Sequence, residues 1–425
     1  MSTTPDLPFE SHTLPNGLQV VLHPDRSLPL VTVNLWYHVG SKNERPGRTG
    51  FAHLFEHMLF QGSAHVPTNG HFRYVQEVGG VANGSTTHDR TNYYETLPAA
   101  RLDLGLWLES DRMGFLLPAL TQENLDKQRD VVMNERSQRI ENQPYGRASE
   151  TLYGLLYPDG HPYNWPVIGT MEDIAAATLD EVRAFFSTYY APNNAVLTIA
   201  GDVAPGEALD RAAAWFGEIP SAGPVPKVAI DAKPLGGERR GVLADEILLP
   251  RVYLAFRTPP YGSRAWYAAD LLASLLSGGK SSLLYRDLIY DRQTAQEVGA
   301  WVSLGEASGT FTLIATARPG VALEEIEAAL AGHLERIAAG EIAEGDLERA
   351  RKRALTDYFG SLQRLDMRAD LLARFATFFG DPGGAAREVE VYRTLASREL
   401  ADFAATYCRP ADRACLWIVP RSAAR

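Results

Sequence analysis

Runs of apolar residues near the start of each half of the chain predict β-strands. Two such runs lie at residues 18–22 and 31–39, and a third lies at residues 247–257 in the second half. Each is followed by stretches in which apolar residues recur at helical spacing. Strands and helices therefore occur in groups, without the regular alternation of a βαβ protein, and this arrangement predicts an α+β fold.

The two halves of the chain also end alike. Residues 178–202 carry a helical pattern that leads, through a tyrosine and a proline, into the apolar strand 195–200. Residues 397–420 repeat this order, with the strand at 414–419, at an offset of about 217 residues. The repeat predicts two related α/β domains, each with a mixed, mostly antiparallel sheet packed with helices.

A segment rich in proline and glycine separates the halves. Residues 219–240 contain Ile-Pro-Ser-Ala-Gly-Pro-Val-Pro and, further on, Lys-Pro-Leu-Gly-Gly-Glu, and such residues interrupt helices and strands. We therefore predict a first domain at residues 1–220, a linker at 221–240 and a second domain at 241–425. Both domains have the usual size of a folded unit.

The composition narrows the range of partners. The 425 residues are 45% hydrophobic and 22% charged, as in ordinary soluble globular proteins. Acidic residues outnumber basic ones by 52 to 41, and the net charge of −11 argues against nucleic acid as a partner. No run approaches the roughly 18 apolar residues that span a bilayer, so no membrane span is expected.

The start of the chain and its cysteines bear on the compartment. The first residues lack the basic start and apolar core of a signal peptide, so we expect the cytoplasm, with the periplasm as the alternative if a signal peptide was removed. The two cysteines, Cys408 and Cys415, are too few for a disulfide scaffold or a cysteine-ligated metal. They could form a local bridge in an oxidising compartment or remain two buried thiols.

Candidate chemistry is concentrated in residues 51–63, a compact apolar segment without proline that predicts a buried helix. His53 and His57 are four residues apart and therefore project from one helix face, where both imidazoles can bind one divalent ion. Glu56 lies on nearly the same face, as a general base for the attacking water requires. The order His-x-x-Glu-His is the inverted form of the zinc-peptidase helix motif.

These residues have a simpler interpretation, two core histidines beside a buried glutamate. The fixed spacing argues against it, since a chain with ten histidines would match by chance in roughly one case in a hundred. Three titratable groups on one apolar helix are also costly to bury without a partner, and a cation supplies that partner.

A catalytic zinc usually has three protein ligands, so a third must come from elsewhere in the chain. The best candidate is Glu135, in a helical stretch that begins after Thr121. The local pattern alone does not single it out, because a glutamate in a charged helix usually faces solvent and Glu123 and Glu141 lie nearby.

Taken together, these motifs resemble the pitrilysin/insulinase family of zinc peptidases. The resemblance is to the half-length branch in particular, which includes the β subunit of mitochondrial processing peptidase and bacterial relatives, and it covers almost the whole chain. Its specific motifs, beside the two strand endings, are residues 50–62, residues 79–94, the Glu135 helix and residues 162–169.

The resemblance implies roles for three further residues. It aligns the family's third metal ligand with Glu135. A supporting glutamate two turns earlier in the family is replaced here by Gln128, whose uncharged amide would support the metal more weakly. Residues 79–94 would pair with an extended substrate, with Asn83 beside the cleft. Without the family, the glycines of this run predict an ordinary hairpin.

The expected function is that of a zinc metalloendopeptidase subunit that hydrolyses unstructured peptides. The second half contains no His-x-x-Glu-His, so one Zn²⁺ per chain is expected. Zinc would polarise the peptide carbonyl and the bound water, while Glu56 takes the water's proton and later delivers it to the leaving amine. The alternatives are a non-catalytic assembly or core subunit of the same fold, and a metal-binding protein without hydrolytic role.

The second half predicts that the chain works with a related subunit. In the family, this domain supplies an arginine and, seven residues later, a tyrosine that hold the substrate and its developing oxyanion. Aligned on the turn at residues 277–282, the two positions hold Ile289 and Gln296, and neighbouring registers also lack the pair. We therefore expect a heterodimer in which a sister chain supplies the pair, the alternative being that this branch uses other residues.

Overall fold

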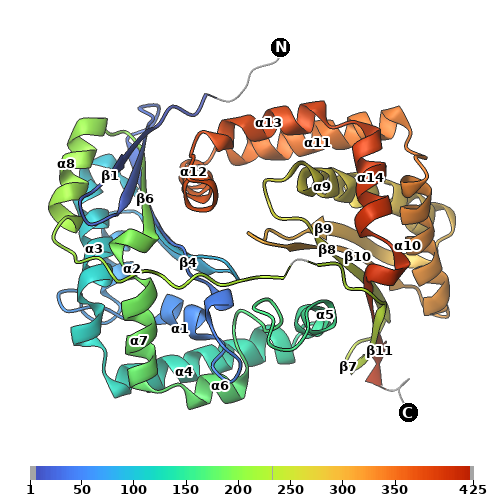
Figure 1. Ribbon diagram of the computed structural model, residues 1–425, viewed down its shortest axis with the longest axis horizontal. Coiled ribbons are helices and arrows are strands. Elements are labelled where there is room, and N and C mark those ends of the chain that lie inside the picture. Colours follow the sequence, from blue (N-terminus) through green and yellow to red (C-terminus); the bar gives the residue numbers. More distant parts are fainter. Residues whose placement is uncertain (1–5, 232, 422–425) are drawn as a thin grey trace. The chain divides into compact units, whose positions relative to one another are not determined.

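The computed structural model describes residues 6–231 and 233–421. They form two compact units, each built around one β-sheet (Figure 1). Within the described residues, the first unit consists of the chain up to Arg136 with Trp165–Val228 and Phe359–Glu388, and the second of Ser137–Asn164, Ala229–Tyr358 and the chain from Val389 onward.

The sheet of the first unit has the strand order β1-β2-β6-β3-β5-β4. Strands β2 and β6 are parallel, and all other neighbours are antiparallel. The strands are β1 (Glu10–Thr13), β2 (Gln19–Pro24), β3 (Leu30–Tyr37), β4 (Val81–Thr86), β5 (Thr91–Pro98) and β6 (Ala195–Gly201).

The sheet of the second unit has the order β7-β11-β8-β10-β9. Here β7 and β11 are parallel and the other neighbours antiparallel, so the sheet repeats β2-β6-β3-β5-β4 strand for strand. The strands are β7 (Arg239–Asp245), β8 (Arg251–Thr258), β9 (Ala295–Val302), β10 (Gly309–Ala317) and β11 (Arg413–Pro420). The predicted α+β class, with two related, mostly antiparallel sheets, is confirmed.

Five helices follow β5 in the first half, α3 to α7, and five follow β10 in the second, α10 to α14. The first half contains α1 (Phe51–Met58), α2 (Gly70–Glu77), α3 (Leu102–Ala119), α4 (Gln122–Arg136), α5 (Ala148–Leu156), α6 (Met171–Ala176), α7 (Leu179–Tyr189) and α8 (Pro205–Phe216). The second contains α9 (Arg264–Ser277), α10 (Leu323–Ala338), α11 (Glu344–Ser361), α12 (Leu365–Phe379), α13 (Gly384–Thr394) and α14 (Ser397–Tyr407). Short 3₁₀ or π-helical turns are η1 (Ser41–Asn43), η2 (Ala99–Arg101), η3 (Ser137–Glu141), η4 (Pro192–Asn194), η5 (Tyr285–Asp291) and η6 (Pro410–Asp412).

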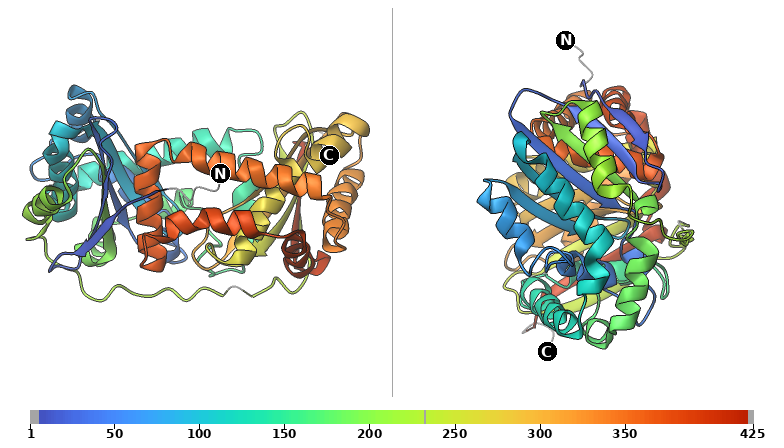
Figure 2. Two further views of the ribbon diagram at one scale, coloured as in Figure 1. Left: turned by 90° about the horizontal axis from the view of Figure 1, so that it is seen from above. Right: turned by 90° about the vertical axis from the view of Figure 1, so that its left-hand side faces the viewer.

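One helix on each sheet comes from the other half of the sequence. In the first unit α12 packs on β6 and β3, on the face opposite α3 and α8 (Figures 1 and 2). In the second unit α5 packs on β11 and β7, and its apolar side joins the core of that sheet. The two helices occupy equivalent places in the order of elements, one after α4 and the other after α11. The two compact units therefore do not coincide with the domains predicted at residues 1–220 and 241–425. Those boundaries stay a prediction about the two duplicated segments of the sequence.

Two expected elements are shorter in the structure. Helix α1 ends at Met58, where the pattern predicted a helix through residue 63, and the chain then turns so that Gly62 has a φ of 121° and packs against the backbone at Val66. Strand β8 begins at Arg251, after Pro250, which cannot donate a ladder hydrogen bond.

The described residues between Gly217 and Glu238 form neither helix nor strand.

In the described parts of the chain, no helix is both long and apolar enough to cross a membrane. Cys408 and Cys415 are both buried as free thiols.

Candidate active site

The site is built on helix α1, whose start is held by a buried carboxylate. The helix begins directly after Gly50, whose own φ is 89°. The two carboxylate oxygens of Glu44 accept hydrogen bonds from the backbone N–H groups of Gly50 and Ala52, both at 2.8 Å. Glu44 thereby satisfies donors that the first turn of a helix leaves unpaired. Burial raises the pKa of Glu44, and these two hydrogen bonds oppose the rise.

A glycine-to-glycine contact fixes the direction from which α1 starts. Gly169 has a φ of 80°, and a Cβ atom there would lie 2.6 Å from the Cα of Gly50 and 2.6 Å from the carbonyl oxygen of Thr49. Beside this contact, the backbone N–H and the hydroxyl of Thr49 donate to Asp173 Oδ2, at 3.0 and 2.6 Å. Only glycine permits such an approach of two backbones.

The same loop holds the end of helix α4. Arg136, the last residue of α4, is buried, and its Nη1 donates to the carbonyl oxygen of Gly169 at 2.9 Å. Glu135 precedes it. The backbone around Gly169 therefore ties the first turn of α1 to the last turn of α4, two segments that are far apart in the sequence.

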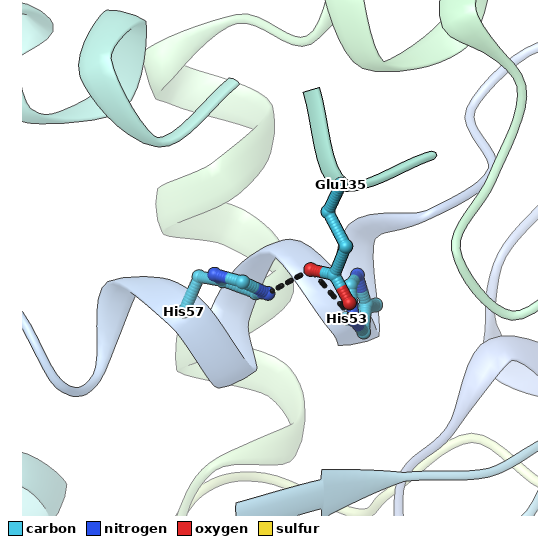
Figure 3. A group of neighbouring side chains, drawn as sticks. All are labelled: His53, His57 and Glu135. Carbon is cyan, nitrogen blue, oxygen red and sulfur yellow. Dashed lines mark ion pairs between the residues drawn. The ribbon is translucent and has the colours of Figure 1, made fainter. Parts of the chain in front are cut away.

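This arrangement brings His53, His57 and Glu135 together (Figure 3). Glu135 Oε2 lies 2.9 Å from His57 Nε2 and 3.9 Å from His53 Nε2. One ligand atom from each residue can be chosen so that all lie within 4.8 Å of one another, and no other such group of three or more His, Cys, Asp or Glu residues occurs among the described residues. The side chains are 12%, 23% and 15% exposed, respectively, so an ion could reach them while most of their surface is shielded from water.

The three ligand atoms suit zinc. Two imidazole nitrogens and one carboxylate oxygen are the donors of many catalytic zinc sites, which leave a further position open. The alternative Glu123 lies outside this group and pairs with Lys127 at 2.6 Å on the exposed side of α4. Glu141 also lies outside the group.

Glu56 is half-buried, and a hydroxyl of strand β4 holds it. Thr86 Oγ1 donates to Glu56 Oε2 at 2.7 Å. Burial raises the pKa of Glu56, and the Thr86 hydrogen bond and the charges of His57 and Arg90 oppose the rise. A carboxylate with a raised pKa is a better proton acceptor than one in water.

The other two residues that the sequence analysis named, Gln128 and Asn83, lie on helix α4 and strand β4. Gln128 is buried on α4, two turns before Glu135, and its Oε1 accepts no hydrogen bond from the described residues. Asn83 is exposed on β4, and its Oδ1 accepts from the N–H of Gly84 at 2.9 Å. Strand β4 is one edge of its sheet and forms a hairpin with β5. The hairpin turns at residues 87–90, whereas Asn83 and Gly84, which also signal a turn in the sequence, lie inside β4.

Sequence reasoning missed the residues that support the site. Glu44, Thr86 and Gly169 each act through a contact between segments that no local pattern reveals. The one available signal in the sequence was that positions 50 and 169 are glycine, since a glycine just before a helix and another in a motif often mark close backbone contacts. Both glycines have a positive φ in the structure.

A duplicated α+β fold with a His-x-x-Glu-His helix and a converging glutamate defines a zinc-peptidase-like protein of the inverted-motif class. Two family models match the chain, "Insulinase (Peptidase family M16)" over residues 19–160 and "Peptidase M16 inactive domain" over residues 176–354. The chain belongs to peptidase family M16, the insulinase family, and to its half-length branch.

Individual relatives agree with this assignment. The chain is 31% identical over 371 residues to the zinc protease PqqE of Helicobacter pylori, covering 86% of this chain and 83% of that one. The crystal structure of a protease from Helicobacter pylori matches with a TM-score of 0.92 at 28% identity, over 97% of this chain and 100% of that one. By fold alone, at 20% identity and a TM-score of 0.78, 98% of the chain matches 48% of the periplasmic protease PqqL from Escherichia coli.

Proposed function

We propose that this chain is a zinc metalloendopeptidase subunit that hydrolyses unstructured peptides. The observation that carries the proposal is the convergence of His53, His57 and Glu135 beside the half-buried carboxylate of Glu56. Relatives named zinc proteases support it.

In this proposal His53, His57 and Glu135 hold one Zn²⁺. Zinc, when bound, would supply a Lewis acid that polarises the scissile carbonyl and makes water acidic enough to be deprotonated near neutral pH. Glu56 accepts the proton of the attacking water at its carboxylate and then delivers it to the leaving amine. Thr86 holds one oxygen of this carboxylate. The other oxygen is then available for the proton.

The substrate is proposed to be extended because the site lies beside a sheet edge. Thr86, which contacts Glu56, is the last residue of the edge strand β4. An extended peptide can add to such an edge through main-chain hydrogen bonds, which select an unfolded conformation rather than one side chain. Asn83, exposed on the same strand, would then lie beside the bound peptide.

The ligand assignment is tested by zinc content. His53→Ala, His57→Ala and Glu135→Ala are each expected to lose most bound zinc, because each removes one of three ligands. His12→Ala, which removes a histidine 3.3 Å from Glu10 on β1, is the matched control and should retain zinc. If Glu135→Ala still binds one zinc per chain, Glu135 is not the third ligand and another residue is.

Glu56→Gln separates the peptidase from its alternatives. This variant should retain zinc and lose cleavage of a quenched peptide library, since the amide cannot accept the proton. If the zinc-loaded wild-type chain and its complexes cleave no peptide, the chain is a non-catalytic subunit or a metal-binding protein.

The chain is further proposed to pair with a related but different subunit. Ile289, half-buried in η5, and Gln296, exposed on β9, carry neither a guanidinium nor a phenol that could hold an oxyanion. The zinc-loaded chain alone should therefore turn over slowly, and a related subunit with an Arg/Tyr pair should raise the rate. Full turnover as a homo-oligomer, unaffected by that subunit, would exclude this part of the proposal.

A further inference from the structure

Thr86 makes a hydrogen bond to Glu56 through a side chain that strand geometry fixes. Thr86 is the last residue of strand β4 and pairs with Thr91 of β5. Thr91 in turn donates from its hydroxyl to the carbonyl oxygen of Val39 at 2.9 Å. The Thr86 hydroxyl is thus held on one side by the sheet, and it donates to Glu56 Oε2 at 2.7 Å on the other.

Arg90 holds the residues on both sides of Thr86. Its Nη1 donates to the carbonyl oxygen of Ser85 at 2.7 Å and to Asn92 Oδ1 at 3.0 Å. Its backbone exchanges hydrogen bonds with Thr87: the N–H of Arg90 donates to Thr87 Oγ1 at 3.1 Å, and the N–H of Thr87 donates to the carbonyl oxygen of Arg90 at 2.8 Å. Ser85 and Thr87 are therefore both fixed by one arginine.

Helix α12 supports this arginine from the other face of the sheet. The guanidinium carbon of Arg90 lies 4.9 Å from the ring centroid of Trp36 on β3, a cation–π contact. The indole N–H of Trp36 donates to Asp370 Oδ1 of α12 at 3.1 Å, and Arg374 of the same helix donates to Asp370 Oδ2 at 2.8 Å. A helix from the second half of the sequence thereby reaches the strand that contacts Glu56.

From these contacts we infer that Thr86 is a positioning residue for Glu56, and that Arg90, held by Trp36 and Asp370, keeps Thr86 in place. The inference rests on the proposed role of Glu56 as the general base. A glutamate side chain on a half-buried helix has several rotamers, and only those that point to the water can accept its proton. Thr86 selects one of them before substrate binds.

The kinetic test compares variants that remove one contact each. Thr86→Val keeps the shape but removes the hydroxyl, and it should lower kcat about tenfold to a hundredfold with KM changed less than about twofold. Thr86→Ser restores a hydroxyl and should recover most of the rate. Arg90→Gln should lower kcat by about threefold to tenfold, and Asp370→Ala by a smaller factor, because they act through one and two further contacts.

The matched control is Thr96→Val on β5, which removes a hydroxyl hydrogen bond to Thr32 Oγ1 at 2.8 Å in the same sheet. It should leave kcat, KM and zinc affinity unchanged. Zinc affinity, measured by competition with a chelator, should also stay unchanged in Thr86→Val, since Thr86 touches no proposed ligand in a hydrogen bond. A loss of zinc in Thr86→Val would overturn the inference in favour of a general structural role.

Crystal structures of the zinc-loaded variants decide the inference without any activity. In Thr86→Val the carboxylate of Glu56 should occupy a different or a mixed rotamer, whereas in Thr86→Ser and Thr96→Val it should stay in place. An unmoved Glu56 in Thr86→Val would overturn the positioning role, even if the wild type cleaves peptides. If the wild type cleaves none, the proposed function fails while the position of Glu56 still tests this inference.

Discussion

The two halves of the chain use the same topology around different helices. In the first half β3 leads to α1, a short helix that carries His53, Glu56 and His57. In the second half the equivalent strand β8 leads to α9, a longer helix with no histidine or glutamate and a mostly apolar, buried surface. Likewise α4 ends in Glu135 and Arg136, whereas its counterpart α11 ends in Gly360 and Ser361.

The contacts that hold the starts of these helices are more alike in the two halves than the helices themselves. Glu181, at the start of α7, accepts from the backbone N–H of Thr178 and from Arg48, which precedes α1. Glu399, at the start of α14, accepts from the backbone N–H of Ala396 and from Arg264, the first residue of α9. The capping glutamate and its arginine therefore occur in both halves of the fold. The halves differ in the proposed metal ligands and in the glycine contact beside α1 and α4.

Breaking the glycine contact should have the largest effect. Gly169→Ala places a Cβ atom 2.6 Å from the Cα of Gly50 at a φ of 80°, and it should lower the free energy of unfolding by about 2–4 kcal/mol and weaken zinc binding. Denaturant unfolding and zinc titration measure both. Gly160→Ala is the control, because Gly160 has the same φ of 80° with nothing within 4 Å of the added atom, and it should cost only about 1 kcal/mol. Equal losses in the two variants would contradict the role of the contact.

An ion pair between the buried Glu327 and the exposed Arg240 in the second half gives a test in which stability should change and metal binding should not. Glu327 accepts from Arg240 at 2.6 and 2.8 Å, and the hydrogen bonds of Arg240 lower the pKa of Glu327 to about 2. Since this pKa lies below the ordinary value of 4.5, the stabilisation is complete above pH 4.5 and is lost as the pH falls toward 2. Glu327→Gln should therefore lower the free energy of unfolding by about 2–3 kcal/mol at pH 7, with the difference vanishing near pH 2.

Zinc content is the second measurement for this variant. The zinc content should remain at one per chain in Glu327→Gln at pH 7, because the one group of potential ligands found among the described residues, His53, His57 and Glu135, lies in the first half. If Glu327→Gln is folded but has lost its zinc, zinc binding in the first half depends on the second half, contrary to this comparison.

The smallest expected effect concerns Gln128 on α4. Gln128→Glu adds a carboxylate two turns before the proposed ligand Glu135 and should tighten zinc binding by roughly threefold to tenfold. Because Gln128 is buried, the metal-free protein should also lose about 1 kcal/mol of stability. Isothermal titration with zinc and unfolding of the metal-free protein measure the two changes. Unchanged affinity would place residue 128 outside the surroundings of the metal.

Local patterns predicted the parts of the structure that local physics determines. The histidine spacing identified the helix face of α1, and Thr121 was expected before α4, where its hydroxyl accepts from the N–H of Asn124 at 3.2 Å. The choice of Glu135 over Glu123 needed the family resemblance, because only packing of α4 against α1 distinguishes two glutamates of one helix. The hydrogen bond between Thr86 and Glu56 could not be predicted from the sequence for the same reason, because it joins two segments that only the packing brings together.

The exchange of α5 and α12 was not predicted either. Helical periodicity shows that each helix has an apolar face, but an apolar face fits either of two similar sheets. The connection that carries α12 to the first sheet becomes visible only in contacts such as Trp36 with Asp370.

This exchange has a consequence for synthesis on the ribosome. When the last strand of the first sheet, β6, has emerged, its end at Gly201 is still 164 residues before Leu365, the first residue of the helix that covers one face of that sheet. At about 5–20 residues per second, the nascent chain exposes that face for on the order of 10–30 s. Holding chaperones that bind emerging chains are therefore expected to raise the yield of folded protein, and most of all for fragments that end before residue 365.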